Sequence, residues 1–301
     1  MRTHKTLLCA LILAVLVLPV TAAAQTDLYG GIGRGSPLNP GALITINQDT
    51  GAGTLVGHPD SVPGLTGLVF DLSGTLYGTT ISGMLGTGRF SELVRIDPST
   101  GAQIGPAVTI KANNVPISIT DLALRPSSNT LYGTSLSEED FTNTIYTISP
   151  TTGVATLIGN TGVIGATIAF GPDGTLYQTS ATFDDAGGFV AGFLNTLDPD
   201  TGAVLTTSAP FTSEHVGGLA VRPTDSVIFA SGGDAGRLWT LSPTGTQILL
   251  GVTNIGGVGD LAFTPLPTSK DQCKDGGWQR FSFPHSFKNQ GDCIQFVNTG
   301  K

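Results

Sequence analysis

Two aspartates, Asp121 and Asp260, stand at the same place in a short apolar motif that recurs along the chain. The residue that opens each copy is, in chain order, Gly67, Asp121, Thr167, Gly218 and Asp260. Equivalent positions of a repeat gather in space, so the two carboxylates and Thr167 could together bind a cation or a sugar hydroxyl.

Glu214 and His215 lie just upstream of one copy, in "SEHVGG", and could serve the same site. The candidate ligand-binding residues are therefore Asp121, Asp260, Thr167, Glu214 and His215. The structural alternative is that an aspartate at a strand start accepts hydrogen bonds from backbone N–H groups.

An enzymatic site has weaker support in the sequence. Two carboxylates suffice in principle for a glycoside hydrolase, but no Glu occupies an equivalent motif position. A metal-dependent lyase or lactonase would need more ligands than this partial set, so no metal is assigned and calcium is the one cofactor considered. The histidines support no Ser-His-Asp arrangement, and no catalytic residue is identified.

A repeat must position these residues. Five "LY"-type motifs align in register on Tyr29, Tyr77, Tyr132, Tyr177 and Phe229. Turn motifs such as "IDPSTG" follow each of them, and motifs such as "DLAL" precede four of them. The spacing of roughly 42 to 55 residues is typical of propeller blades or solenoid turns. Each unit is predicted to hold four short strands joined by tight turns.

The two ends of the repeat are complementary. The first unit begins at Asp27 without its first strand, and the chain later supplies a surplus one at Gly259–Phe263. We predict an all-β fold: a five-bladed β-propeller closed by pairing of the last strand with the first blade, because closure hides both terminal edges.

The unit "GLAFxPxGTLYgtS…LytIdPxTGxxtlIG" resembles the repeats of secreted bacterial β-propellers, including lactonase-like and quinoprotein-like relatives. The resemblance covers residues 27–265. Since such repeats carry binding, lyase and hydrolase activities, it implies the fold and leaves the activity open.

Long loops between the second and third strands indicate which face carries function. They cover residues 31–41, 80–92, 136–143 and 182–193, and together with the loops that precede the first strands they share one face. Binding residues are often found on such loops. Several phenylalanines fall in or near them and either stack on a ligand or anchor the loops: Phe90, Phe141, Phe183, Phe189 and Phe193.

The predicted organisation has three parts. Residues 1–24 form a signal peptide with a basic start, an apolar run at Leu7–Val20 and cleavage after Ala24. Residues 25–266 form the propeller, and residues 267–301 form a small C-terminal module. The chain is expected to be secreted or held at the cell surface.

The C-terminal module contains Cys273 and Cys293, the two cysteines outside the signal peptide. An exported pair of this kind is expected to form a disulfide that staples a segment too short for a large core. The pattern "DQCKxGGW…FKNQGDC" resembles a terminal segment found on diverse secreted bacterial proteins, for which sorting, surface retention or docking are open alternatives to simple packing on the propeller.

Charge excludes one class of partner. Residues 25–269 hold seven Lys and Arg against nineteen Asp and Glu, so a nucleic-acid backbone would be repelled. The apolar run of the signal peptide is too short for a comfortable membrane span, no other stretch could span a membrane, and a monomer is expected. We predict a non-enzymatic binding or surface-interaction propeller for a glycan, a protein or another cell-surface ligand; the alternative is a hydrolase or lyase acting at the channel mouth.

Overall fold

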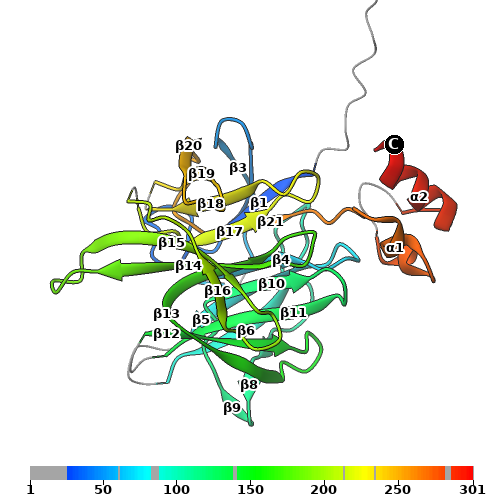
Figure 1. Cartoon of the computed structure of the whole chain (residues 1–301). Helices are drawn as coiled ribbons and strands as arrows, with labels where there is room; N and C mark the ends of the chain where they lie inside the picture. The colour runs from blue at the N-terminus through cyan, green and yellow to red at the C-terminus, as the bar shows by residue number, and fades with distance from the viewer. Residues whose placement is uncertain are drawn as a thin grey trace, which may run out of the picture.

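The computed structural model describes residues 26–59, 62–82, 88–137, 141–212, 214–233, 235–281 and 286–300. The expected signal peptide and its cleavage point lie outside these residues. Within them strands dominate, and helices occur only after Ser269 (Figure 1).

Three sheets have four antiparallel strands each. The first has the order β21 (Val258–Phe263), β1 (Leu28–Ile32), β2 (Leu43–Ile46) and β3 (Gly53–Gly57). The second has the order β4 (Gly67–Phe70), β5 (Leu76–Ser82), β6 (Phe90–Ile96) and β7 (Val108–Thr109). The third has the order β17 (Gly218–Val221), β18 (Ile228–Gly232), β19 (Arg237–Leu241) and β20 (Gln247–Val252). We call these sheets units 1, 2 and 5.

A seven-stranded sheet contains the remaining two units. Its order is β10 (Asp121–Arg125), β11 (Thr130–Leu136), β12 (Thr142–Ile148), β13 (Ala155–Phe170), β14 (Leu176–Phe183), β15 (Phe189–Leu197) and β16 (Val204–Thr207). Unit 3 ends, and unit 4 begins, within β13. A separate hairpin is formed by β8 (Lys111–Ala112) and β9 (Val115–Pro116).

The continuous strand β13 differs from the sequence prediction of two separate strands. No proline interrupts residues 155–170, and the strand continues from one unit into the next through an irregularity at Gly162, whose φ is 71°. Its first part pairs with β12 and its last part pairs with β14, with register shifts in both ladders. Each half therefore keeps the neighbour that the repeat predicts.

The last strand pairs with the first, as the ends of the repeat predict. In the antiparallel ladder between β21 and β1, Leu28 lies opposite Phe263 and Gly31 lies opposite Asp260. The innermost strands also contact one another in cyclic order: β21 with β4, β4 with β10, β10 with β13, β13 with β17, and β17 with β21.

The repeated "TG" turns lie against the outer strand of the preceding unit. A Cβ atom on Gly57 of unit 1 would lie 1.9 Å from the Thr100 carbonyl oxygen of unit 2. A Cβ on Gly251 of unit 5 would likewise lie 1.9 Å from the Thr50 carbonyl oxygen of unit 1. No side chain fits there, so the recurring glycines mark contacts between units, and unit 5 meets unit 1 as unit 1 meets unit 2.

The C-terminal module is helical, which the sequence analysis did not predict. It consists of α1 (Lys270–Cys273), the 3-10 helix η1 (Gly277–Arg280) and α2 (Gln290–Thr299), at one side of the sheets (Figure 1). The disulfide Cys273–Cys293 is present, as expected, and lies in a small core with Phe281, Phe287 and Phe296. Leu72 and Leu124 of units 2 and 3 contribute to this core, which attaches the module to the sheets.

Candidate functional site

A cavity of about 660 Å³ opens on the face that carries the long loops. Residues from the segments before the first strands line its base, and residues from the second-to-third-strand loops line its walls. Apart from glycines, five apolar side chains line it (Leu65, Leu136, Phe141, Ile164 and Phe183) together with three uncharged polar ones (Thr66, Thr120 and His215). Both sets of loops therefore meet at one cavity, whose volume and apolar walls are typical of a small-molecule site.

Aromatic groups form one side of this cavity. The His215 ring lies 6.2 Å from the Phe183 ring and 6.3 Å from the Phe189 ring, measured between centroids. Burial lowers the pKa of His215, so the imidazole is neutral at pH 7. Phe141 and Phe183 remain 51% and 42% exposed, so both present apolar surface that the chain itself does not cover.

The predicted aspartates lie beneath the base of the cavity and not in its wall. Asp121 and Asp260 are both fully buried. Residues that immediately precede the motif, such as Thr66 and Thr120, line the cavity, whereas the aspartates do not. Each of the five innermost strands presents one backbone N–H group at this depth, from Leu68, Leu122, Ile168, Leu219 and Leu261.

The two carboxylates accept all five of these N–H groups. Asp121 accepts from Leu122 and Ile168, and Asp260 accepts from Leu68, Leu219 and Leu261, at donor–acceptor distances of 2.5 to 3.4 Å. Thr167 donates its hydroxyl to Asp121. These are the backbone hydrogen bonds of the structural alternative, and they satisfy donors that the inner edge of each first strand would otherwise leave unpaired.

The pair holds an unusual charge state. Burial raises the pKa of Asp121 to about 6, against the hydrogen bond from Asp260 and those from Thr167 and two backbone N–H groups. Burial raises the pKa of Asp260 well above its ordinary value, and the neighbouring Asp121 carboxylate raises it further. The two carboxyls therefore hold a proton between them to a higher pH than exposed aspartates do, and Asp260 is the more strongly affected of the two.

The remaining candidate, Glu214, forms an ion pair with Arg237 instead of joining the aspartates. Its Oε2 atom is buried without a hydrogen-bond partner among the described residues. The structure thus brings Asp121, Asp260 and Thr167 together in one buried layer and places His215 in the lining of the cavity. Glu214 joins neither group and pairs with Arg237.

The loops predicted from the sequence contain part of the cavity wall, including Leu136, Phe141 and Phe183. Sequence reasoning did not name Leu65 and Ile164, which also line it and do not stand out by residue type. Leu65 had one detectable signal, because it precedes the "GLVF" motif by the same two positions by which Ile119 precedes "DLAL".

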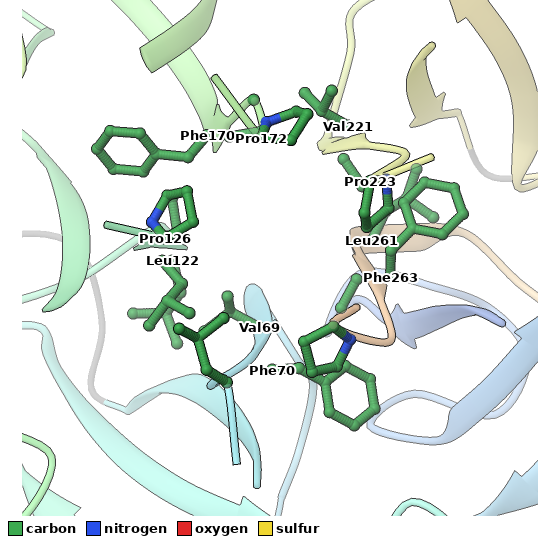
Figure 2. Close-up of a pocket in the computed structure, with 18 of the residues that line it drawn as sticks. Val69, Phe70, Leu122, Pro126, Phe170, Pro172, Val221, Pro223, Leu261 and Phe263 are labelled. Carbon is green, nitrogen blue, oxygen red and sulfur yellow. The ribbon is translucent and has the colours of Figure 1, made fainter. Parts of the chain in front are cut away.

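A second, smaller cavity of about 120 Å³ lies at the opposite end of the innermost strands. Figure 2 shows its labelled apolar side chains arranged around an open centre, with Pro126, Pro172 and Pro223 at the ends of three innermost strands. Leu266 and, from α1 of the C-terminal module, Gln272 also line it. The aspartate layer lies between the two cavities.

Among the described residues, no group of three or more His, Cys, Asp or Glu side chains could hold a metal ion. None of the helices in the described part of the chain is long and apolar enough to cross a membrane.

Neither a protein-family model nor a curated protein matches this chain. Among solved structures, it is similar to a chain of the nidogen/laminin complex, with 19% identity over 79% of this chain and 82% of that chain, and a TM-score of 0.50. It is also similar to the Dos1 propeller (12% identity, 75% and 55% of the two chains, TM-score 0.40). A third is the periplasmic gluconolactonase of Pseudomonas aeruginosa (12% identity, 80% and 99%, TM-score 0.43).

At such identities the likeness concerns the fold alone. The chain has a propeller-type, all-β fold with a disulfide in its C-terminal module. Because unrelated activities share this architecture, function has to be argued from the cavity itself.

Proposed function

We propose that this chain is an exported, five-bladed propeller that binds a neutral, mainly apolar ligand in the cavity on its loop-rich face, without catalysis. The observation that carries the proposal is the cavity itself: about 660 Å³, walled by aliphatic and aromatic side chains, with Phe141 and Phe183 exposed. Covering such surface with an apolar ligand is favourable by roughly 25 cal/mol per Å² removed from water.

Charge supports a neutral ligand. No Lys, Arg, Asp or Glu among the described residues lines the cavity. His215 is uncharged at pH 7 because burial lowers its pKa. The aspartates beneath the base are already engaged by backbone N–H groups. An anion or a metal ion would therefore find no compensating charge here.

Polar groups are few, which favours an apolar ligand over a glycan. The Thr66 hydroxyl is within hydrogen-bond distance of Ile119, and the Thr120 hydroxyl donates to the Thr134 carbonyl. A sugar loses its hydration on burial and needs several hydrogen bonds in return. Two occupied hydroxyls and one imidazole do not supply them.

Ring closure and export belong to the same proposal. The pairing of β21 with β1 and the cyclic contacts of the innermost strands support a closed ring of five blades. A disulfide persists in oxidising compartments, which supports the export that residues 1–24 predict.

The test is binding of neutral aromatic probes such as naphthalene to the chain from Gln25 to Lys301, measured by calorimetry. Phe183→Ala should weaken binding about tenfold, because a large aromatic contact is lost. The matched control is Leu205→Ala, which removes a 63%-exposed side chain from the outer strand β16 and should change nothing.

Failure of every neutral probe to bind would refute the proposal. The hydrolase or lyase alternative is tested by incubating the same protein with glycoside and lactone substrates. Turnover that is lost in His215→Ala would support catalysis at the cavity mouth in place of binding alone.

A further inference from the structure

Four units share one arrangement at the edge of the cavity. Two positions before its first-strand motif, each has a buried aliphatic residue: Leu65, Ile119, Val216 and Val258. At the "LYGT" position of the second strand, each has a very small residue: Gly78, Gly133, Ala230 and Gly30.

Contacts explain why the second residue is small. A Cβ atom on Gly78 would lie 2.8 Å from Leu65 Cδ2, and one on Gly133 would lie 3.0 Å from Ile119 Cγ2. The aliphatic side chain therefore covers the glycine and closes the space between neighbouring units.

Unit 4 reverses this arrangement. Its aliphatic position is Gly165, and its second strand carries Gln178 in "LYQTS". A Cβ atom on Gly165 would lie 2.5 Å from Gln178 Nε2 and 2.3 Å from Asn143 Oδ1. The glutamine amide thus fills the space that an aliphatic side chain fills in the other units, and Asn143 lies beside it.

These amides are buried and incompletely hydrogen-bonded. Gln178 and Asn143 are both fully buried. Asn143 Nδ2 donates to the Thr134 hydroxyl at 2.6 Å, but Asn143 Oδ1 and both amide atoms of Gln178 have no partner among the described residues. Turning the amides toward each other could pair Asn143 Oδ1 with Gln178 Nε2, and Gln178 Oε1 would still lack a donor. Buried amides without partners are costly, so a polar group in place of an aliphatic one calls for a purpose.

Their position indicates that purpose. Gly165 lines the loop-face cavity, as Leu65 does in unit 2. The amides do not line the cavity themselves and lie directly behind Gly165, which has no side chain to separate them from it. We propose that the Gln178 amide, with Asn143, is the polar recognition point of the cavity, and that the ligand is a neutral, mainly apolar molecule carrying one hydroxyl or carbonyl group. This inference rests on the proposed function, whose cavity it uses.

The amide chemistry restricts the polar group of the ligand. Gln178 offers both a donor and an acceptor without charge, which suits a hydroxyl or a carbonyl oxygen. A carboxylate or an ammonium group would enter an apolar cavity whose described lining has no opposite charge.

The repeat itself provides the test variant. The triple substitution Asn143→Ser/Gly165→Ile/Gln178→Gly recreates the arrangement of Ser91, Ile119 and Gly133 around unit 3, removes both side chains that a Cβ on residue 165 would meet, and should fold as the parent does. Gln178→Leu, which keeps a similar volume, is the second variant should the first not fold. Naphthalene, 2-naphthol and 2-naphthoate serve as probes, because they share one apolar body and differ in the polar group.

The parent should bind 2-naphthol at least fivefold more tightly than naphthalene and should not bind 2-naphthoate. The variant should bind naphthalene within twofold of the parent and lose the preference for 2-naphthol. If the parent shows no preference for 2-naphthol over naphthalene, or if the variants keep that preference, the inference is overturned. Binding of naphthalene by the parent would still uphold the proposed function. Absence of all binding by the parent would overturn both.

Discussion

The substitution Asp260→Asn tests whether the buried aspartate pair holds a proton. In the folded chain burial raises the pKa of both carboxyls, and the Asp121 carboxylate raises that of Asp260 further. In the unfolded chain both ionise near their ordinary pKa of about 3.9. Above that pH the folded state therefore binds more protons than the unfolded state, and the free energy of unfolding must fall as pH rises.

The magnitude follows from the proton count. A difference of one bound proton changes the free energy of unfolding by about 1.4 kcal/mol per pH unit. Asparagine is neutral without a proton, so the substitution removes the contribution of Asp260 and leaves that of Asp121. At every pH above about 4 at which Asp260 keeps its proton in the folded state, the parent should lose about 1.4 kcal/mol per pH unit relative to the variant.

The two stabilities should therefore converge or cross. At pH 5 the variant is the less stable, because an amide nitrogen in place of Oδ2 cannot accept the Leu68 N–H group, at a cost of about 1–3 kcal/mol. At pH 7 the parent should have lost that advantage. His215 acts in the opposite direction, since burial lowers its pKa, but it contributes equally to both proteins and cancels in the difference.

Urea unfolding at pH 5, 6 and 7, followed by circular dichroism and extrapolated to water, gives the required free energies. Asp49→Asn, at an exposed position, is the matched control and should follow the parent at every pH. Parallel pH dependences of the parent and Asp260→Asn would refute the claim that Asp260 carries a proton in the folded state.

Three further predictions concern the ring, the module and the cavity. Gly57→Ala and Gly251→Ala should each cost about 2 kcal/mol in urea unfolding, since both force a methyl group onto a backbone carbonyl; a neutral Gly251→Ala would contradict the contact between units 5 and 1. Replacing Cys273 and Cys293 with serine should destabilise the module by roughly 3 kcal/mol and raise amide hydrogen exchange in the module more than in the sheets. An equal rise in the sheets would show that the disulfide does not act on the module alone. Binding of naphthalene should stay constant from pH 8 to pH 6.5 and weaken at lower pH as His215 gains charge; a decline that begins above pH 6.5 would contradict its lowered pKa.

The strand pattern of the sheets was predictable because each unit repeats the same turn chemistry. The glycine of each "TG" turn has a positive φ, for example 72° at Gly101, and the motif that predicts this turn occurs five times in the sequence. The continuity of β13 was not predictable in the same way, because "NTG" at residues 160–162 is a turn signal, yet Gly162 takes a φ of 71° within a strand that continues on both sides. The helices of the C-terminal module had usable signals: Ser269 and Gln272 form a capping box, Asn289 caps α2, and Gly300 ends it.

The candidate site was predicted less well, for a physical reason. Register placed Asp121 and Asp260 correctly at one depth, but register does not say whether a carboxylate faces a cavity or accepts backbone N–H groups. The walls of the cavity depend on how loop residues such as Phe141 and Ile164 turn, which no repeat specifies. Gln178 was visible in the sequence as a departure from "LYGT", and its meaning required the contact with Gly165.

Packing around the centre explains the variation that first drew attention to Asp121 and Asp260. A Cβ atom on Gly67 would lie 2.8 Å from the Leu122 nitrogen, and one on Gly218 would lie 2.6 Å from the Asp260 Cα. The residue that precedes each aspartate around the centre, Gly67 before Asp121 and Gly218 before Asp260, must therefore be glycine. Two carboxylates suffice because each oxygen can accept more than one N–H group.

The residues of this layer differ from unit to unit, as glycine, aspartate or threonine, because together they pair the backbone N–H groups of the five innermost strands. A departure that no neighbour requires is a better guide to function. The exchange of an aliphatic residue and a glycine for Gly165 and Gln178 is of that kind, because it leaves buried amide atoms without partners beside the cavity. Function in this fold is therefore to be sought one layer above the aspartates, on the wall that unit 4 provides.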